Sequence, residues 1–138
     1  MSVSDALKKR VSVRAFSNTP VPQAVLEEIF TMARQAPSNC NVQPCRVYIV
    51  SGAKKDQLKD ELVSAALSGA PANPDFEWDL KYQAEHRERQ FGSANALYSA
   101  MGIERTDKQR RQIAMLRNWN FFGAPHAAFF TMAKYLKL

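Results

Sequence analysis

Two arginines and a serine alternate with valines near the start of the chain, in the run RVSVR of residues 10–14. In an extended segment, Arg10, Ser12 and Arg14 project to one side while the valines turn to the other. Guanidinium groups form paired, charge-assisted hydrogen bonds with phosphate oxygens, and a hydroxyl adds a neutral one. The pattern predicts a clamp suited to a nucleotide monophosphate. The alternative is an exposed strand edge whose basic side chains are simply solvated.

A second polar cluster lies in the loop between Pro37 and Pro44. Its side chains are those of Ser38, Asn39, Asn41 and Gln43. Neutral amides both donate and accept hydrogen bonds, so they can recognise the edge of a planar heteroaromatic ring. The two prolines stiffen the loop that presents them. Ordinary turn chemistry is the alternative, because Ser and Asn are common in turns without any ligand.

Cysteine and histidine are too few and too irregularly spaced for a metal centre. The chain has two of each, namely Cys40, Cys45, His86 and His126. The spacing of the two cysteines matches neither the Cys-x-x-Cys redox motif nor half of a zinc framework. We therefore expect reduced, unpaired thiols and no bound metal.

The balance of charge is basic, with 19 Lys and Arg against 13 Asp and Glu and a formal net charge of +6. An excess of positive charge favours anionic ligands, including nucleic acids and nucleotide phosphates. Five basic residues fall on one predicted helix and could form a nucleic-acid surface: Arg105, Lys108, Arg110, Arg111 and Arg117. No RNP aromatic pattern, KH loop or zinc finger accompanies them, so a nucleic-acid partner is not expected.

The composition is that of an ordinary globular domain. Apolar residues make up 46% of the 138 residues and charged residues 23%, which predicts a chain able to bury a core. No apolar run approaches the roughly 18 residues that span a membrane. The first residues also lack the apolar segment of a secretory signal. We expect a single cytoplasmic domain over residues 1–138 with no membrane contact.

Apolar periodicity and turn signals predict the elements that position these clusters. Helices are predicted over residues 4–9, 23–35, 54–67, 80–100 and 107–121, the first capped by Ser4 and the last by Thr106 or Asp107. A buried strand is predicted over residues 46–50 and a second, apolar strand over residues 127–132. Residues 10–22 are predicted to be loop or extended chain, and the amide-rich loop then lies between a helix and a strand.

The predicted strands are few for a chain of this length. Helices alternate with strands, so the fold class is α+β with flanking helices, but two strands seldom support an independent core. We therefore expect the missing strands to come from a further segment or from a partner chain.

In this order and at this separation, the motifs resemble those of the nitroreductase family of FMN-dependent oxidoreductases. The family pattern is Arg-x-Ser-x-Arg-x-Phe, then a helix, then Ala-Pro-Ser-x-x-Asn-x-Gln-Pro-Trp before a strand. The chain has RVSVRAF and later ARQAPSNCNVQPCRVYIV. The segments YSAMGIER and FFGAP, with Asp107, Arg111 and Asn118, resemble the branch that reduces nitroaromatic acids. The resemblance covers essentially the whole chain and implies a nitroreductase-like α-β-α sandwich.

The resemblance implies roles for the residues that match the family motifs. Arg10 and Ser12 match positions that hold the phosphate and ribityl chain of FMN, and Arg14 matches a third member of that clamp. Asn118 or Asn120 lies where a polar residue meets the flavin pyrimidine. These five positions form the first half of the implied cofactor site.

The amide-rich loop supplies the second half of the implied site. Its matching residues are Pro37, Ser38, Asn39 and Asn41. In the family this loop reaches a flavin bound mainly to the other subunit, so the resemblance implies a homodimer with two shared sites. Cys45 replaces the usual tryptophan after Gln-Pro, and Cys40 stands where small polar residues are more common. Neither departure removes the clamp.

The implied activity is reduction of nitroaromatic or quinone-like small molecules, with FMN as cofactor and NAD(P)H as electron donor. The flavin carries the chemistry, so no catalytic side chain is assigned and the protein holds the ring and stabilises charge. Five aromatic residues could line the acceptor pocket or simply pack in the core. They are Phe76, Trp78, Tyr82, Trp119 and Phe121.

Family members are longer chains, so the resemblance implies an incomplete sandwich that corresponds to the amino-terminal portion only. The second half of the family fold supplies a core helix at the dimer interface and further strands. The alternative to an active enzyme is therefore a non-catalytic remnant that binds flavin weakly or pairs with a full-length relative.

Overall fold

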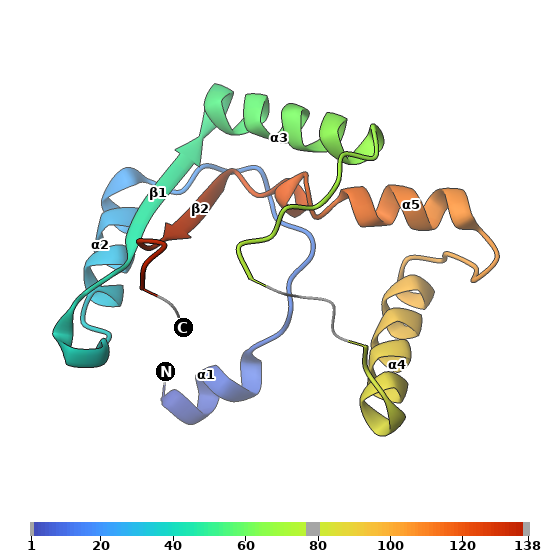
Figure 1. Ribbon diagram of the computed structural model, residues 1–138, viewed down its shortest axis with the longest axis horizontal. Helices are drawn as coiled ribbons and strands as arrows, with labels where there is room; N and C mark the ends of the chain where they lie inside the picture. Colours follow the sequence, from blue (N-terminus) through green and yellow to red (C-terminus); the bar gives the residue numbers. More distant parts are fainter. Residues whose placement is uncertain (1, 77–80, 137–138) are drawn as a thin grey trace.

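The computed structural model describes residues 2–76 and 81–136. The helices are α1 (Val3–Lys9), α2 (Gln23–Ala33), α3 (Gly52–Leu67), α4 (Ala84–Ala100) and α5 (Lys108–Leu116), and the strands are β1 (Arg46–Ser51) and β2 (His126–Thr131). Single 3-10 turns cover Asn39–Asn41 and Phe121–Gly123. The two strands lie side by side with α2 and α3 next to them, whereas α4 and α5 extend to the other side of the molecule (Figure 1).

Helix α1 begins at Val3, one residue earlier than predicted. Ser2, and not Ser4, is the N-cap: its hydroxyl accepts a hydrogen bond from the Asp5 N–H at 3.1 Å, and the Asp5 carboxylate accepts from the Ser2 N–H at 3.1 Å. This reciprocal pair is a capping box. Hydrogen bonds from the side chain and then the backbone of Ser2 lower the pKa of Asp5.

The other helices are confirmed with bounds that differ from the predicted ones at one end or both. Helix α4 begins at Ala84, and the predicted start at residue 80 lies outside the described residues. Helix α5 is capped by Asp107, one of the two candidates, but ends at Leu116 and not near residue 121. Beyond Leu116 the chain continues as tight turns: the Asn118 N–H donates to the Met115 carbonyl oxygen and the Trp119 N–H to that of Leu116, so the α-helical hydrogen-bond pattern ends there.

The strands form a two-stranded antiparallel sheet in which Arg46 pairs with Thr131 and Ser51 with His126. In the part of the chain that the structure describes, these are the two strands of the sheet, as the sequence predicts. Helix α3 follows β1 directly and packs against both strands. No helix among the described residues is long and apolar enough to span a membrane.

The prediction that residues 46–50 form a buried strand is wrong. Tyr48 is 54% exposed and Phe130 is 63% exposed, because within residues 2–76 and 81–136 neither strand has a second neighbour and few elements cover the sheet. In the described residues, Ile103 is the buried hydrophobic side chain, at 8% exposure. Helix α2 likewise contains no buried residue, although its apolar periodicity predicts a core-facing side.

The total surface confirms that the core is open. The chain exposes 12100 Å², whereas a compact monomer of this mass exposes about 7,000 Å². The difference is far larger than the roughly 800 Å² that each partner buries in a standard protein interface. This open arrangement agrees with the expectation that two strands do not support an independent core.

Candidate functional site

We call residues 10–22 the basic segment and residues 117–126 the cradle segment. Hydrogen bonds between these two segments hold the basic segment in place. The Arg117 guanidinium donates to the Arg14 carbonyl oxygen at 2.7 Å. The Phe16 N–H donates to the Phe122 carbonyl oxygen at 3.2 Å. These bonds join segments about a hundred residues apart, so the position of Arg14 depends on tertiary structure and not on local geometry.

Gly123 lets the cradle segment pass close to the basic segment. Its φ is +79°, a left-handed conformation that glycine adopts without steric cost. A Cβ built there lies 3.7 Å from the Phe16 carbonyl oxygen, which is ordinary contact. The backbone conformation, rather than lack of space, is therefore the reason for glycine.

A third bond fixes the end of the same loop. The Val21 N–H donates to Nε2 of His126 at 2.8 Å, and Nδ1 of His126 is hydrogen-bonded to the hydroxyl of Ser51. Lys55 of α3 adds a bond from its Nζ to the Ala124 carbonyl oxygen at 3.1 Å. The cradle segment thus ties the loop before α2 to the junction between β1 and α3.

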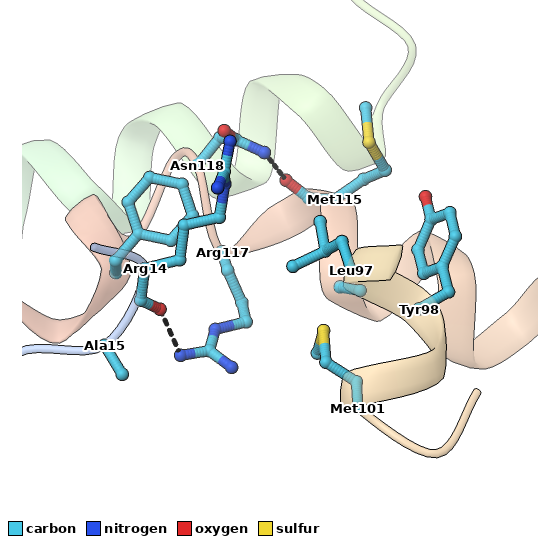
Figure 2. A pocket seen from close by; sticks show the side chains of 10 residues that line it. Arg14, Ala15, Leu97, Tyr98, Met101, Met115, Arg117 and Asn118 are labelled. Carbon is cyan, nitrogen blue, oxygen red and sulfur yellow. Dashed lines mark hydrogen bonds between the residues drawn. The ribbon is translucent and has the colours of Figure 1, made fainter. Parts of the chain in front are cut away.

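A cavity of about 300 Å³ opens where the basic segment meets α4 and α5 (Figure 2). Its polar lining comes from Arg14, Arg117 and Asn118. The remaining lining residues are Ala15, Leu97, Tyr98, Met101, Ala114, Met115 and Phe122. Two guanidinium groups and an amide at the side of apolar walls suit a planar ligand that carries negative charge or carbonyl oxygens.

The polar groups at this cavity retain capacity to bind. Arg14 makes one long hydrogen bond, of 3.4 Å, to the Ser12 carbonyl oxygen, so most of its donors are available. The Asn118 Nδ2 donates to the Met115 carbonyl oxygen at 2.8 Å. Among the described residues nothing donates to the Asn118 Oδ1, which leaves an acceptor at the cavity (Figure 2).

A second cavity of about 490 Å³ shares Arg14, Leu97, Tyr98 and Met115 with the first. Tyr82 is among the residues that line this second cavity. The other aromatic candidates are placed differently. Phe76 and Trp119 are exposed, Phe121 packs edge-on against Phe129, and Trp78 lies outside the described residues.

The remaining members of the predicted clamp lie on exposed chain. Arg10 follows α1, and Ser12 lies in the irregular loop between α1 and α2. Asn120 is the N-cap residue of the 3-10 turn and does not line the cavity that Asn118 lines. The structure therefore brings Arg14 and Asn118 together, while the ligand roles of all these residues stay predictions.

The amide-rich loop is held by its own hydrogen bonds. The Ser38 hydroxyl accepts from the Gln43 N–H at 2.9 Å, and the Gln43 Nε2 donates to the Asn41 Oδ1 at 2.9 Å. Cys40 and Asn41 have φ of 49° and 53°, so the loop adopts a constrained shape. Pro37, Asn39 and Asn41 are exposed. The loop follows α2 at the far side of the sheet from α5 (Figure 1).

Sequence reasoning missed the residues that position the site. Arg117 was assigned only to a basic surface, and His126 only to an improbable metal set. Their role depends on partners about a hundred residues away, which no local pattern reveals. Both cysteines are free and exposed, as expected of unpaired thiols. Within the described ranges, no cluster of His, Cys, Asp and Glu could hold a metal ion.

Comparison with known proteins identifies close relatives. The model of the Nitroreductase family matches residues 7–137. Nitroreductase NfnB of Mycolicibacterium smegmatis is 37% identical over 123 residues, which is 88% of this chain and 52% of the relative. The 4-nitrobenzoate reductase of Pseudomonas putida is 34% identical over 128 residues, covering 93% of this chain and 56% of the relative.

The fold agrees with these sequence matches. The crystal structure of the FMN-dependent nitroreductase NfnB from Mycobacterium smegmatis in complex with NADPH superposes with a TM-score of 0.87 at 32% identity. The match covers 99% of this chain and 63% of that structure. The expected nitroreductase-like α+β fold is thus confirmed, and the chain spans about half the length of the curated relatives it matches.

Proposed function

The chain belongs to the nitroreductase family, and from this premise we propose that it forms part of a cytoplasmic, FMN-dependent oxidoreductase. Its acceptors are nitroaromatic or quinone-like small molecules, and its electron donor is NAD(P)H. The observation that carries the proposal is the convergence of Arg14 and Asn118 on one cavity, held there by bonds between distant segments.

The residues at the cavity fit one side of a flavin. The cavity volume, about 300 Å³, is at the low end for ligand pockets, so the cavity accommodates part of a flavin. Apolar walls from α4 and α5 suit the ring, and the Asn118 Oδ1 offers an acceptor for a ring N–H. Arg14 offers donors for a carbonyl oxygen or phosphate. This donor and acceptor set matches the edge of a flavin.

FMN held at this cavity would supply the hydride and electron-transfer chemistry between the nicotinamide and the acceptor. The chain's own residues bind and orient. Arg10 and Ser12 would hold the phosphate end, and Arg14 would supply positive charge to stabilise the anionic form of the ring. Tyr82, in the adjoining cavity, lies beside the space for an acceptor.

The amide-rich loop favours a second copy of the chain as part of the site. It lies beyond the sheet from α5, so it does not join the cavity of its own chain (Figure 1). A homodimer brings the loop of one chain, with Ser38, Asn39 and Asn41, to the cavity of the other. The exposed surface of 12100 Å² supports this proposal, because it leaves a large area for a partner to cover.

Titration of the purified protein with FMN, followed by flavin fluorescence and visible absorbance, tests the proposal. Replacing Arg14 by Gln removes charge-assisted hydrogen bonds and is expected to weaken FMN binding by about 10- to 100-fold. Arg34→Gln is the matched control, because Arg34 caps α2 away from the cavity. Absence of both a bound-flavin band and NAD(P)H oxidation contradicts the enzyme proposal.

The same open surface also favours a second function, in which the chain binds flavin only when paired with a longer family member. Mixing the chain with such a relative distinguishes the two cases. FMN binding by the chain alone supports the homodimer, whereas binding that requires the relative supports the second function. Size-exclusion chromatography of each mixture reports the assembly directly.

A further inference from the structure

His126, the first residue of β2, joins three separate segments through its imidazole. Nε2 accepts the Val21 N–H at 2.8 Å, at the end of the loop that carries the basic residues. Nδ1 is hydrogen-bonded to the hydroxyl of Ser51, the last residue of β1 and the strand partner of His126. The side chain is half-buried, so these bonds are partly shielded from water.

The Val21 bond determines the protonation state of the ring. A backbone N–H can only donate, so Nε2 must carry a lone pair. The neutral imidazole then has its proton on Nδ1 and donates it to the Ser51 oxygen. His126 therefore cannot act as a base toward Ser51, and the pair is not a nucleophilic dyad. The imidazole instead links the loop before α2 to the end of β1 through two hydrogen bonds, and we call this pair of bonds the fastening.

We propose that neutral His126 is a positioning residue that holds the loop before α2 on the cradle segment, and that protonation of Nε2 releases this loop. An imidazolium has donors at both nitrogens, so Nε2 and the Val21 N–H would face each other as two donors. Histidine is the side chain whose charge ordinarily changes between pH 5 and 8. Protonation of Nε2 therefore removes the acceptor for the Val21 N–H.

The charged groups around His126 come from the two helices packed nearby. Glu27 of α2 lines the same cavity of about 430 Å³ as His126, and its carboxylate accepts from the Gln23 Nε2 at 2.7 Å. From α3, Lys55 reaches the Ala124 carbonyl oxygen and pairs with Asp56 at 3.3 Å.

Release at Val21 loosens the basic segment without freeing it. The loop keeps its two other attachments, at Arg14 and Phe16. Loss of one hydrogen bond of ordinary strength corresponds to about a two- to tenfold change in an equilibrium. The step from loop position to flavin affinity rests on the proposed function, whereas the fastening itself does not.

The first test examines the fastening alone, by NMR of the full chain. At pH 8 the ¹⁵N shifts of His126 are expected to report the proton on Nδ1. The protection factor of the Val21 amide is expected to fall about two- to tenfold between pH 8 and 5.5. The variant His86→Gln assigns the signals, since His86 is the other histidine and is exposed on α4. A proton on Nε2, or pH-independent protection, overturns the proposal.

The second test measures FMN dissociation constants for two amide replacements. In His126→Gln the amide oxygen can reach the place of Nε2 but cannot titrate, so binding is expected to stay strong and lose its pH dependence. In His126→Asn the shorter amide reaches only Ser51, so binding is expected to be about two- to tenfold weaker at every pH. Undiminished pH dependence in His126→Gln overturns the proposal. If no form of the protein binds FMN, the proposed function fails, and Val21 protection still decides the fastening.

Discussion

The two sides of the molecule are organised by interactions of different range. We call β1, β2, α3 and the cradle segment the strand side, and α4, residues 101–107 and α5 the helical side. On the strand side, the Lys55 Nζ bonds to Ala124, 69 residues away. On the helical side, the Arg110 Nη1 bonds to the Gly102 carbonyl oxygen at 2.8 Å, only 8 residues away. The helical side can therefore form without distant segments, and the strand side cannot.

The helical side is held by two neighbouring arginines. Arg110 reaches the carbonyl oxygens of Met101 and Gly102 just after α4, where the last carbonyls of a helix lack partners. The guanidinium of Arg111 lies 5.0 Å from the ring centroid of Tyr98 and donates to the Arg105 carbonyl oxygen. Such contacts close the turn between the two helices around Ile103.

This difference in the sequence separation of bonded residues indicates which side of the molecule depends on a partner. A two-stranded sheet is marginally stable unless another layer covers it, and the large side chains of β1 and β2 remain exposed. The helical side contains Ile103, the buried hydrophobic residue of the described chain. We expect the helical side to retain structure under conditions in which the strand side opens.

Removing the buried side chain on the helical side has the largest expected effect. Ile103→Ala deletes methyl groups at a site only 8% exposed and is expected to destabilise the helical side by about 2–4 kcal/mol. The matched control is Ile113→Ala, at 57% exposure on α5, where a change within about 0.5 kcal/mol is expected. Hydrogen exchange resolved by residue measures both. Equal loss of protection on the strand side would break the distinction between the two sides.

Features determined by nearby residues were predictable from the sequence. Asp107 as a helix cap, the two strands, and the clustering of amides between Pro37 and Pro44 all follow from local residue types. Family motifs then identified Arg14 and Asn118, which the structure brings to one cavity. Local propensity is informative there because the deciding contacts are a few residues apart.

Features determined by distant partners were not predictable in this way. Apolar runs predicted strands that pack in a core, but Tyr48 and Phe130 remain largely exposed because the elements in the described part of the chain cover the sheet only in part. The roles of Arg117 and His126 depend on backbone atoms of the basic segment. Helix α5 ends before the predicted residue 121 because the turns after Leu116 lead into Phe121 and Phe122, whose positive φ values are unusual for aromatic residues and are not signalled by the sequence.

Replacing one glycine on each side of the molecule tests the same distinction, and the expected change in stability is of intermediate size. Gly123→Ala on the cradle segment places a Cβ at φ of +79° and is expected to cost about 1–2 kcal/mol. Gly92→Ala within α4 is the matched control, since its Cβ meets nothing within 4 Å and alanine favours a helix by about 0.5–1 kcal/mol. Thermal unfolding should therefore shift in opposite directions. A shift in the same direction for both variants would contradict the backbone argument.

The smallest effect is expected at the cap of α5, where the helical side relies on a bond between neighbours. The Asp107 Oδ1 accepts the Arg110 N–H at 2.9 Å, so Asp107→Ala leaves that donor unpaired and is expected to cost about 1 kcal/mol. Asp107→Asn keeps an acceptor and should recover most of the loss. Asp60→Ala on α3 is the control, because Asp60 is exposed and pairs only with its neighbour Lys59. If Asp107→Ala also lowers protection of the Val21 amide, the cap supports the cradle segment through Arg117, and the helical side is then not independent of the strand side.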